Sequence, residues 1–142
     1  MLESATRWKH SAPIPSNGPR TSTTASWRWA TVSPDEIWLT DFGDPFPGEP
    51  AHHRPALIIG PSRLFPDNLP FAVVVPLTTT RRGLSLHIEI EPDASNGLDD
   101  VSYAQCEWLR SINRRRLVTR LGAADAATTR EVSRVIRTLL GY

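Results

Sequence analysis

The sequence predicts a mainly β protein in which a small, strongly bent, barrel-like sheet is followed by one C-terminal helix. Three observations lead to this fold class. Short runs of β-branched and aromatic residues recur from residue 33 onward, separated by stretches rich in glycine and proline. One of these runs alternates apolar and polar residues, as a half-buried strand does. Only the last segment of the chain shows the apolar spacing that is typical of a helix.

The first half of the domain is expected to contain three strands. Residues 36–42 are rich in strand-forming side chains and predict the first strand. A Gly/Pro loop follows at 43–48, and a short buried strand is expected at 56–59. Residues 61–70 hold three prolines and should form a loop. The apolar run 71–77 predicts a central strand.

The second half should add further strands. In residues 86–91, alternation directs Leu86, Ile88 and Ile90 toward the core, and it directs His87, Glu89 and Glu91 outward. Next we expect a turn at Asn96-Gly97, a strand over 102–109, a short turn at Arg114-Arg115-Arg116-Leu117 and a last strand near 117–121.

The C-terminal segment predicts an amphipathic helix. Its apolar residues recur at helical spacing: Val132, Val135, Ile136, Leu139 and Leu140. Asp125 is a natural N-cap, and Thr128 with Glu131 offers an alternative capping box. Gly141 stands where a helix commonly ends in a glycine.

Length and composition indicate one domain with an N-terminal extension. Residues 33–142 carry the strand and helix patterns, whereas residues 1–32 are rich in Ser, Thr and Pro and are expected to be disordered or loosely packed. Trp27 and Trp29 leave open that this extension docks on the domain or on a partner. No apolar run is long enough to span a membrane, and the extension is a poor secretory signal, so we expect a cytoplasmic protein.

Charge and cysteine usage exclude several function classes. Residues 1–30 carry four basic residues against one acid, and residues 31–142 carry twelve arginines against fourteen acids. The domain is therefore no bulk nucleic-acid binder, and any RNA contact must use local arginines, which make bidentate phosphate contacts. The single cysteine and scattered histidines give no zinc pattern, and there is no phosphate-binding glycine loop, paired-Asp site or nucleophile elbow. We expect neither metal nor cofactor.

Two residues on neighbouring buried strands make a candidate phosphate site. Arg54 precedes Pro55 at the start of one strand, and its guanidinium could stabilise charge on a phosphate or simply be solvated. Thr78 ends the Val-rich strand, where its hydroxyl could hold a phosphate oxygen or a ribose hydroxyl, or merely begin a turn.

Polar residues around this pair could contact the same phosphate ligand or simply be solvated: Glu49, His53, Thr79, Arg81, Arg82 and Glu107. The family resemblance given below makes them candidate RNA-binding residues. Glu49 could orient Arg54, act as a base or be a solvated loop residue. His52 and His53 are candidate general bases because of their residue type, but neighbours on an extended loop point opposite ways, so at most one faces the site. Glu107 could face a groove or form a buried pair with Arg110, and Cys106 reads as a small core residue.

Four blocks in order resemble the MazF/PemK family of toxin endoribonucleases. They are EIWLTDF at 36–42, Glu49 through RPALII at 54–59, VVPLTT at 74–79, and SYAQCE at 102–107 with Arg110. The closing Leu139-Leu140-Gly141 also fits, so that the resemblance covers residues 33–142.

The resemblance implies an SH3-like or CcdB-like barrel, usually a homodimer, that cleaves single-stranded RNA without metal. It implies that the ribose 2′-hydroxyl attacks the adjacent phosphorus and leaves a 2′,3′-cyclic phosphate and a 5′-hydroxyl. It assigns catalytic roles to Arg54 and Thr78, places Glu49 and Glu107 in the groove, and implies a cognate antitoxin as regulator and growth arrest as the outcome. Two alternatives remain: a non-catalytic CcdB-like poison of a protein such as gyrase, and a relative that binds RNA without cutting it.

Overall fold

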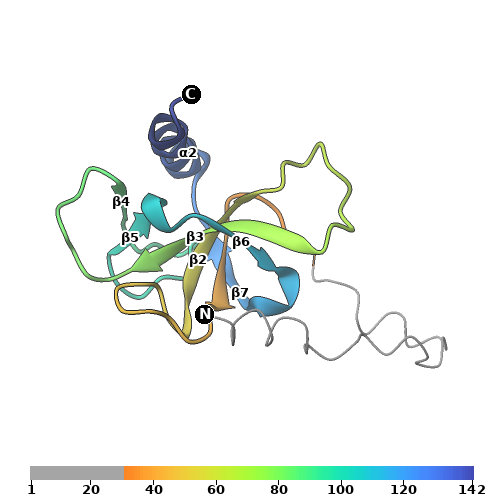
Figure 1. The fold of residues 1–142 in the computed structure, drawn as a ribbon, viewed down its shortest axis with the longest axis horizontal. Helices are drawn as coiled ribbons and strands as arrows, with labels where there is room; N and C mark the ends of the chain where they lie inside the picture. Colours follow the sequence, from red (N-terminus) through yellow and green to blue (C-terminus); the bar gives the residue numbers. More distant parts are fainter. Residues whose placement is uncertain (1–30) are drawn as a thin grey trace, which may run out of the picture.

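The computed structural model describes residues 31–142, which form one seven-stranded antiparallel sheet and a C-terminal helix (Figure 1). The predicted class, mainly β with one terminal helix, is confirmed. Along the sheet the strands follow the order β4 (His87–Ile90), β5 (Ser102–Gln105), β3 (Phe71–Thr78), β2 (His53–Gly60), β1 (Glu36–Asp41) and β7 (Leu117–Ala123). The sheet is not closed, because its edge strands β4 and β7 do not pair. The expected N-terminal extension lies outside the described residues, apart from its last two.

Strand β2 begins earlier than the sequence predicts. Its pairing with β1 continues to the contact between His53 and Asp41, three residues before the expected start at Ala56. Arg54 therefore lies inside a strand and not in the loop before it. This difference matters because a side chain on a paired strand has a fixed direction.

The expected strand over residues 102–109 is wrong in its second half. Strand β5 ends at Gln105, a 3₁₀ turn follows at Cys106–Trp108, and a separate strand β6 covers Arg110–Asn113. The reason is that β3 has two partners along one edge. Strand β5 pairs with Leu77 and Thr78, and β6 pairs with residues 71–74, so the turn carries the chain from one half of β3 to the other.

The helix α2 (Ala126–Leu140) packs on one face of the sheet, where Val132, Val135 and Ile136 join a cluster with Leu57 and Leu77. A second cluster on the opposite face contains Trp38, Phe42, Ala56, Ile58 and Val74. Side chains that alternate along β2 and β3 thus divide between two cores, which is why both strands read as continuous apolar runs.

Both predicted helix boundaries are confirmed. The Asp125 carboxylate accepts a hydrogen bond from the Thr128 amide at 2.7 Å, so Asp125 is the N-cap and the alternative capping box is not used. Gly141 ends the helix in the left-handed conformation, with a φ of 85°. The expected short turn at Arg114–Arg116 is also present as a 3₁₀ turn.

The apolar stripe of α2 is buried only in part. Leu139 and Leu140 are 46% and 59% exposed, because the last turn of the helix extends beyond the sheet (Figure 1). No helix within residues 31–142 combines the length and apolar character needed to cross a membrane.

The turn at Asn96-Gly97 is confirmed and is tightly packed. The Asn96 side chain donates to the Glu91 carbonyl at 2.7 Å and accepts from the Leu98 amide at 3.0 Å. Gly97 has a φ of 70°, and a Cβ at this position would lie 2.1 Å from the Leu121 carbonyl oxygen. The turn can approach β7 only because residue 97 has no side chain.

Candidate anion-binding site

The strand register brings the two principal candidates together. Strands β2 and β3 pair Ala56 with Pro76, so continuing this register by two residues places Arg54 opposite Thr78. On the other side of β2, Arg54 pairs directly with Thr40 of β1. Residues opposite each other on antiparallel strands point to the same face, so the Arg54 guanidinium and the Thr78 hydroxyl share one surface.

The same row continues across the rest of the sheet. Thr78 pairs with Tyr103 of β5, and Tyr103 pairs with Glu89 of β4. A line of polar side chains therefore crosses the sheet from Arg54 to Glu89. We call these four residues, Arg54, Thr78, Tyr103 and Glu89, the polar row.

The polar row lies on the face opposite α2. Leu57, Val75 and Leu77 pack in the cluster under the helix. Successive side chains of a strand point to opposite faces, and Arg54 and Thr78 lie one or three residues from these core residues on β2 and β3. Their side chains therefore point to the other face. Ala56, on the same face as Arg54, packs in the second cluster. The helix therefore does not cover the polar row.

Arg54 carries a positive charge that no carboxylate within residues 31–142 neutralises through an ion pair. Its Nε donates to the Ala51 carbonyl at 3.2 Å, and none of the three ion pairs within residues 31–142 includes it. Partial burial lowers the pKa of Arg54 below its usual value, and the nearby charge of Arg82 lowers it further. Two close guanidinium groups without a carboxylate favour binding of an anion, which would relieve their repulsion.

Thr78 offers a hydroxyl proton to the same surface. Its Oγ1 accepts a hydrogen bond from the Thr80 amide at 3.2 Å, which fixes the turn after β3. The hydroxyl can still donate, since the turn uses only one lone pair. Thr79 and Thr80 are exposed beyond the end of the strand.

Glu107 is held by a residue that the sequence analysis placed elsewhere. Both Glu107 carboxylate oxygens lie 2.9 Å from His87 Nε2, and the His87 side chain is only 3% exposed. The prediction that His87 faces solvent is therefore wrong, because the turn at 106–108 carries Glu107 over it. The expected alternative, a buried pair of Glu107 with Arg110, is also wrong: Arg110 lies over the Phe42 ring, 5.7 Å from its centroid.

The loop between β1 and β2 places Glu49 and the histidines differently from the predictions. The Glu49 carboxylate accepts from the Phe46 amide at 3.2 Å and so closes its own turn. No ion pair joins Glu49 to Arg54 among the described residues. His52 has a φ of 53°, so the chain is not extended there, and His53 is an exposed residue at the start of β2.

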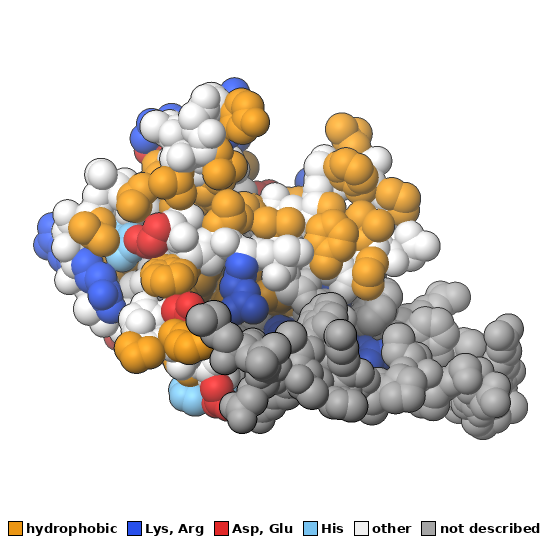
Figure 2. All heavy atoms as spheres, in the orientation of Figure 1, with side chains coloured by type: hydrophobic (Ala, Val, Ile, Leu, Met, Phe, Trp, Pro, Cys, Tyr) orange, Lys and Arg blue, Asp and Glu red, His pale blue; other side chains and the backbone are white. Residues whose placement is uncertain are grey.

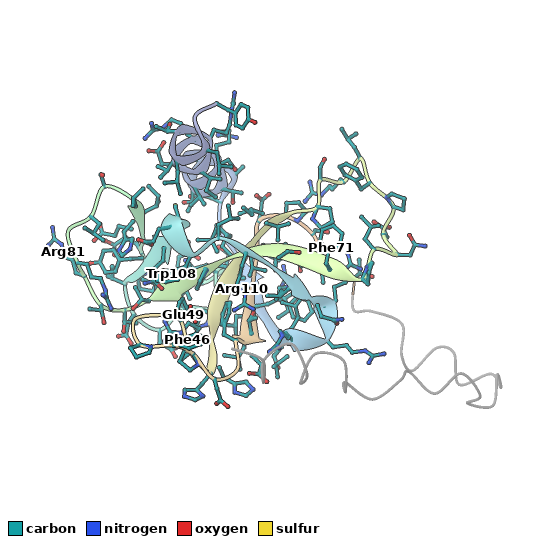
Figure 3. The ribbon with its side chains drawn as sticks, viewed as in Figure 1. Phe46, Glu49, Phe71, Arg81, Trp108 and Arg110 are labelled. Carbon is teal, nitrogen blue, oxygen red and sulfur yellow. The ribbon has the colours of Figure 1, made fainter. Side chains whose placement is uncertain are left out.

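Figure 3 shows how these segments share the near face of the molecule. Glu49, Phe46, Trp108 and Arg110 lie close together in this view, although they come from three different segments. Arg81 lies at the outer edge of the molecule, in the β3–β4 loop. In Figure 2 the same face is a mixture of apolar, acidic and basic side chains, in keeping with the small net charge of the domain. The arrangement gives local positive charge and not a broad basic surface.

Among residues 31–142, neither a reactive cysteine nor a group of metal ligands contributes to this site. Cys106 is fully buried, and desolvation with the nearby Glu107 charge raises its pKa to about 11, so that the thiol stays protonated and inert. Its predicted role as a core residue is confirmed. Within residues 31–142 no three His, Cys, Asp or Glu side chains are grouped as metal ligands would be.

The sequence analysis missed three residues of this surface: His87, Tyr103 and Glu89. A signal for two of them was present, because alternation in 86–91 put His87 and Glu89 on the face away from the core. Tyr103 had no such signal, since only the pairing of β5 with both β3 and β4 shows that it completes the polar row.

A small antiparallel sheet that carries an arginine without an ion-pair partner in residues 31–142, opposite a threonine hydroxyl, makes this surface a candidate anion-binding site. The family of this chain follows from comparison with known proteins. Residues 33–140 match the family described as PemK-like, MazF-like toxin of type II toxin–antitoxin system, and the chain belongs to this family. The resemblance read from the four sequence blocks is therefore confirmed.

Solved structures show the same fold. The MazF-mt6 toxin of Mycobacterium tuberculosis superposes with a TM-score of 0.61 at 24% identity, over 74% of this chain and 95% of that one. MazF from Deinococcus radiodurans gives 0.68 at 21% identity, over 80% and 99% of the two chains. A mycobacterial endoribonuclease in complex with its cognate antitoxin gives 0.62 at 22% identity, over 78% and 95%. The predicted MazF/PemK fold is thus present, although its sheet is open.

Proposed function

We propose that this toxin is a metal-independent, sequence-selective endoribonuclease, an mRNA interferase that cleaves single-stranded RNA. The observation that carries the proposal is the uncompensated charge of Arg54 opposite the Thr78 hydroxyl. A phosphodiester supplies what this pair lacks, namely a negative charge and oxygen acceptors. The proposed compartment is the cytoplasm, where such RNA is present.

The proposed reaction uses the 2′-hydroxyl of the substrate as nucleophile. The bond from the 2′-oxygen to phosphorus forms while the bond from phosphorus to the 5′-oxygen breaks. The 2′-oxygen releases its proton to solvent water, and the 5′-oxygen gains one, so that the protons balance. The products are a 2′,3′-cyclic phosphate and a 5′-hydroxyl. Arg54 stabilises the charge that grows on the non-bridging oxygens, and Thr78 donates to the same phosphate. The need for a 2′-hydroxyl selects RNA over DNA.

Arg54 is also the proposed proton donor to the leaving 5′-oxygen. Desolvation and the charge of Arg82 lower its pKa, and a lower pKa makes proton donation less costly. Glu107, held by His87, and Glu49, in the loop beside it, are proposed to line the groove. Thr79, Arg81, Arg82 and His53 are proposed RNA contacts on its rim.

We further propose two partners for the toxin. One is a cognate antitoxin whose disordered segment folds into the groove and competes with RNA, as the complex formed by the mycobacterial relative suggests. The other is a second copy of this chain. Leu139, Leu140 and Tyr142 leave apolar side chains exposed at the end of α2, and a homodimer that includes this end would cover them.

The test is cleavage of a mixed RNA in EDTA, followed by mapping of the new ends. Wild-type protein should produce discrete cuts with cyclic phosphate and 5′-hydroxyl ends, and Arg54→Ala should produce none. The matched control is Arg137→Ala, which removes an exposed arginine from α2 on the other side of the sheet. Cleavage by Arg54→Ala at the wild-type rate would overturn the assignment of Arg54. Intact RNA with folded wild-type protein would favour the CcdB-like poison.

A further inference from the structure

A small cavity adjoins the polar row beyond Thr78. Its volume is about 190 Å³, and it lies between the β3–β4 loop and strands β4 and β5. The lining residues are Arg81, Gly83, Leu84, His87, Glu89 and Tyr103. Tyr103 pairs directly with Thr78, so the cavity opens one strand away from the proposed cleavage site. At the spacing of paired strands, about 5 Å, a neighbouring nucleotide can reach it.

The walls of this cavity combine a cation, a carboxylate and an aromatic ring. The Tyr103 hydroxyl donates to Glu89 Oε1 at 3.3 Å, which orients both side chains and leaves Glu89 Oε2 free to accept. Desolvation and the Glu89 charge raise the pKa of Tyr103, while the charge of Arg81 lowers it, which places all three groups in one electrostatic environment. No ion pair joins Arg81 to Glu89 within the described part of the chain. Both groups therefore remain available to a ligand.

The rest of the cavity is rigid on one side and apolar on the other. The His87 side chain is nearly fully buried and is held through Nε2 by Glu107, so it forms a fixed floor. Leu84 is 47% exposed and contributes an apolar edge that a flat ligand would cover. Gly83 has no side chain to narrow the entrance, and a Cβ built there would meet open space. The cavity suits a planar, partly polar ring.

We propose that this cavity binds a guanine base of the RNA next to the scissile phosphate and so contributes to the sequence selectivity of the toxin. The inference rests on the proposed function, because it assumes that RNA crosses the polar row. In this arrangement guanine stacks on Tyr103, directs its N1–H and N2 amino group to Glu89, and presents O6 and N7 to Arg81.

Guanine is the one common base that satisfies both charged walls. A carboxylate accepts two hydrogen bonds from its adjacent N1–H and N2 amino donors. Adenine and cytosine place a ring-nitrogen acceptor beside their amino group, and that acceptor would face the carboxylate. Uracil has one donor between two carbonyl acceptors. Only a purine supplies N7, and only guanine pairs N7 with an adjacent acceptor, O6, which is the arrangement that arginine binds in a bidentate manner.

The test measures binding separately from cleavage. Fully 2′-O-methylated uridine heptamers cannot be cut, and each carries guanine, adenine, inosine, 7-deazaguanine or uridine at its centre. Fluorescence anisotropy with wild-type protein should show that the guanine oligomer binds roughly ten- to a hundredfold more tightly than the uridine oligomer. Inosine, which lacks the N2 amino group, and 7-deazaguanine, which lacks N7, should each lose part of this preference.

Single-residue variants test which side chains cause the guanine preference. Glu89→Gln should reduce the guanine preference about tenfold, while Glu131→Gln, the same change on α2 at the other face of the sheet, should leave it unchanged. Arg81→Lys should abolish the discrimination between guanine and 7-deazaguanine, because lysine cannot bind O6 and N7 as a fork. Tyr103→Ala should weaken binding of the guanine oligomer roughly five- to a hundredfold, and Tyr103→Phe, which keeps the ring, should weaken it far less.

The outcomes separate this inference from the proposed function. Equal affinity of wild-type protein for the guanine and uridine oligomers, or a guanine preference that survives in folded Glu89→Gln, would overturn the guanine pocket even if the protein cleaves RNA. A guanine preference that Glu89→Gln removes would support the pocket even if no natural RNA is cut. Circular dichroism and thermal melting of each variant establish that it is folded.

Discussion

Replacing Arg54 by lysine separates the charge of the guanidinium from its shape. Arg54 has five N–H donors, of which Nε–H is used by the Ala51 carbonyl, so four remain for a phosphate in a fixed plane. Lysine keeps the positive charge but lacks Nε and the fork, and its ammonium would lose the anchor at Ala51. Removing one preorganised donor costs on the order of 10²–10³ in rate, or about 3–4 kcal/mol of transition-state stabilisation. We expect Arg54→Ala to lose at least this factor and Arg54→Lys to lose roughly a hundredfold.

The assay is single-turnover cleavage of a short RNA that carries a fluorophore and a quencher, with protein in excess. The affinity of Arg54→Lys for a non-cleavable oligomer should fall much less than its rate, because the charge that attracts the phosphate is retained. Arg82→Ala serves as a comparison, since it removes the neighbouring charge and leaves Arg54 in place. A wild-type rate for Arg54→Lys would refute the reasoning that a bidentate fork is required.

Three further predictions concern the framework of the site. His87→Ala should lower the free energy of unfolding by about 1–3 kcal/mol in urea denaturation, because Glu107 loses its buried partner, and Glu107→Gln should cost less. Gly97→Ala should lower the free energy of unfolding by about 2 kcal/mol or more in the same experiment. The new Cβ would collide with the Leu121 carbonyl, and residue 97 has a positive φ. An unchanged denaturation midpoint would mean that this turn can move. The Asp125 pKa is lowered by its bond to the Thr128 amide, so its stabilising effect should be present above about pH 4 and be lost as the pH falls through its folded-state pKa. Thermal melts should show Asp125→Asn less sensitive to acid over that range than wild type; equal acid sensitivity would contradict this origin.

Most strands were predictable because their sequence patterns are local. Residues 36–41 and 71–78 hold β-branched and aromatic side chains between Gly/Pro breaks, and α2 has both a periodic stripe and two capping residues. The strand expected over 102–109 failed because nothing local marks the turn at 106–108. That turn exists because β3 is paired by two different strands along one edge.

The candidate site was predictable in part, for the same reason. Arg54 and Thr78 could be identified as candidates from their positions near strand ends, whereas their placement in one row depends on the register between β2 and β3. The role of Glu107 could not be read from its neighbours in sequence, because its partner His87 lies twenty residues away. The exposure of Leu139 and Leu140 could not be read from the sequence, because helical periodicity does not show where the sheet beneath a helix ends.

The sequence by itself determined the class of fold, the two helix boundaries and the family, because hydrophobic periodicity, capping and motif blocks act over a few residues. It also marked Arg54 and Thr78 as candidate site residues, which remain a prediction. The tertiary structure alone decided that Arg54 has no carboxylate partner in the described part of the chain, residues 31–142, and that Tyr103 and Glu89 extend the polar row. It also decided that His87 is buried beneath Glu107. These features depend on strand pairing between residues far apart in the chain, and a register shift of one residue would turn each of them to the other face of the sheet.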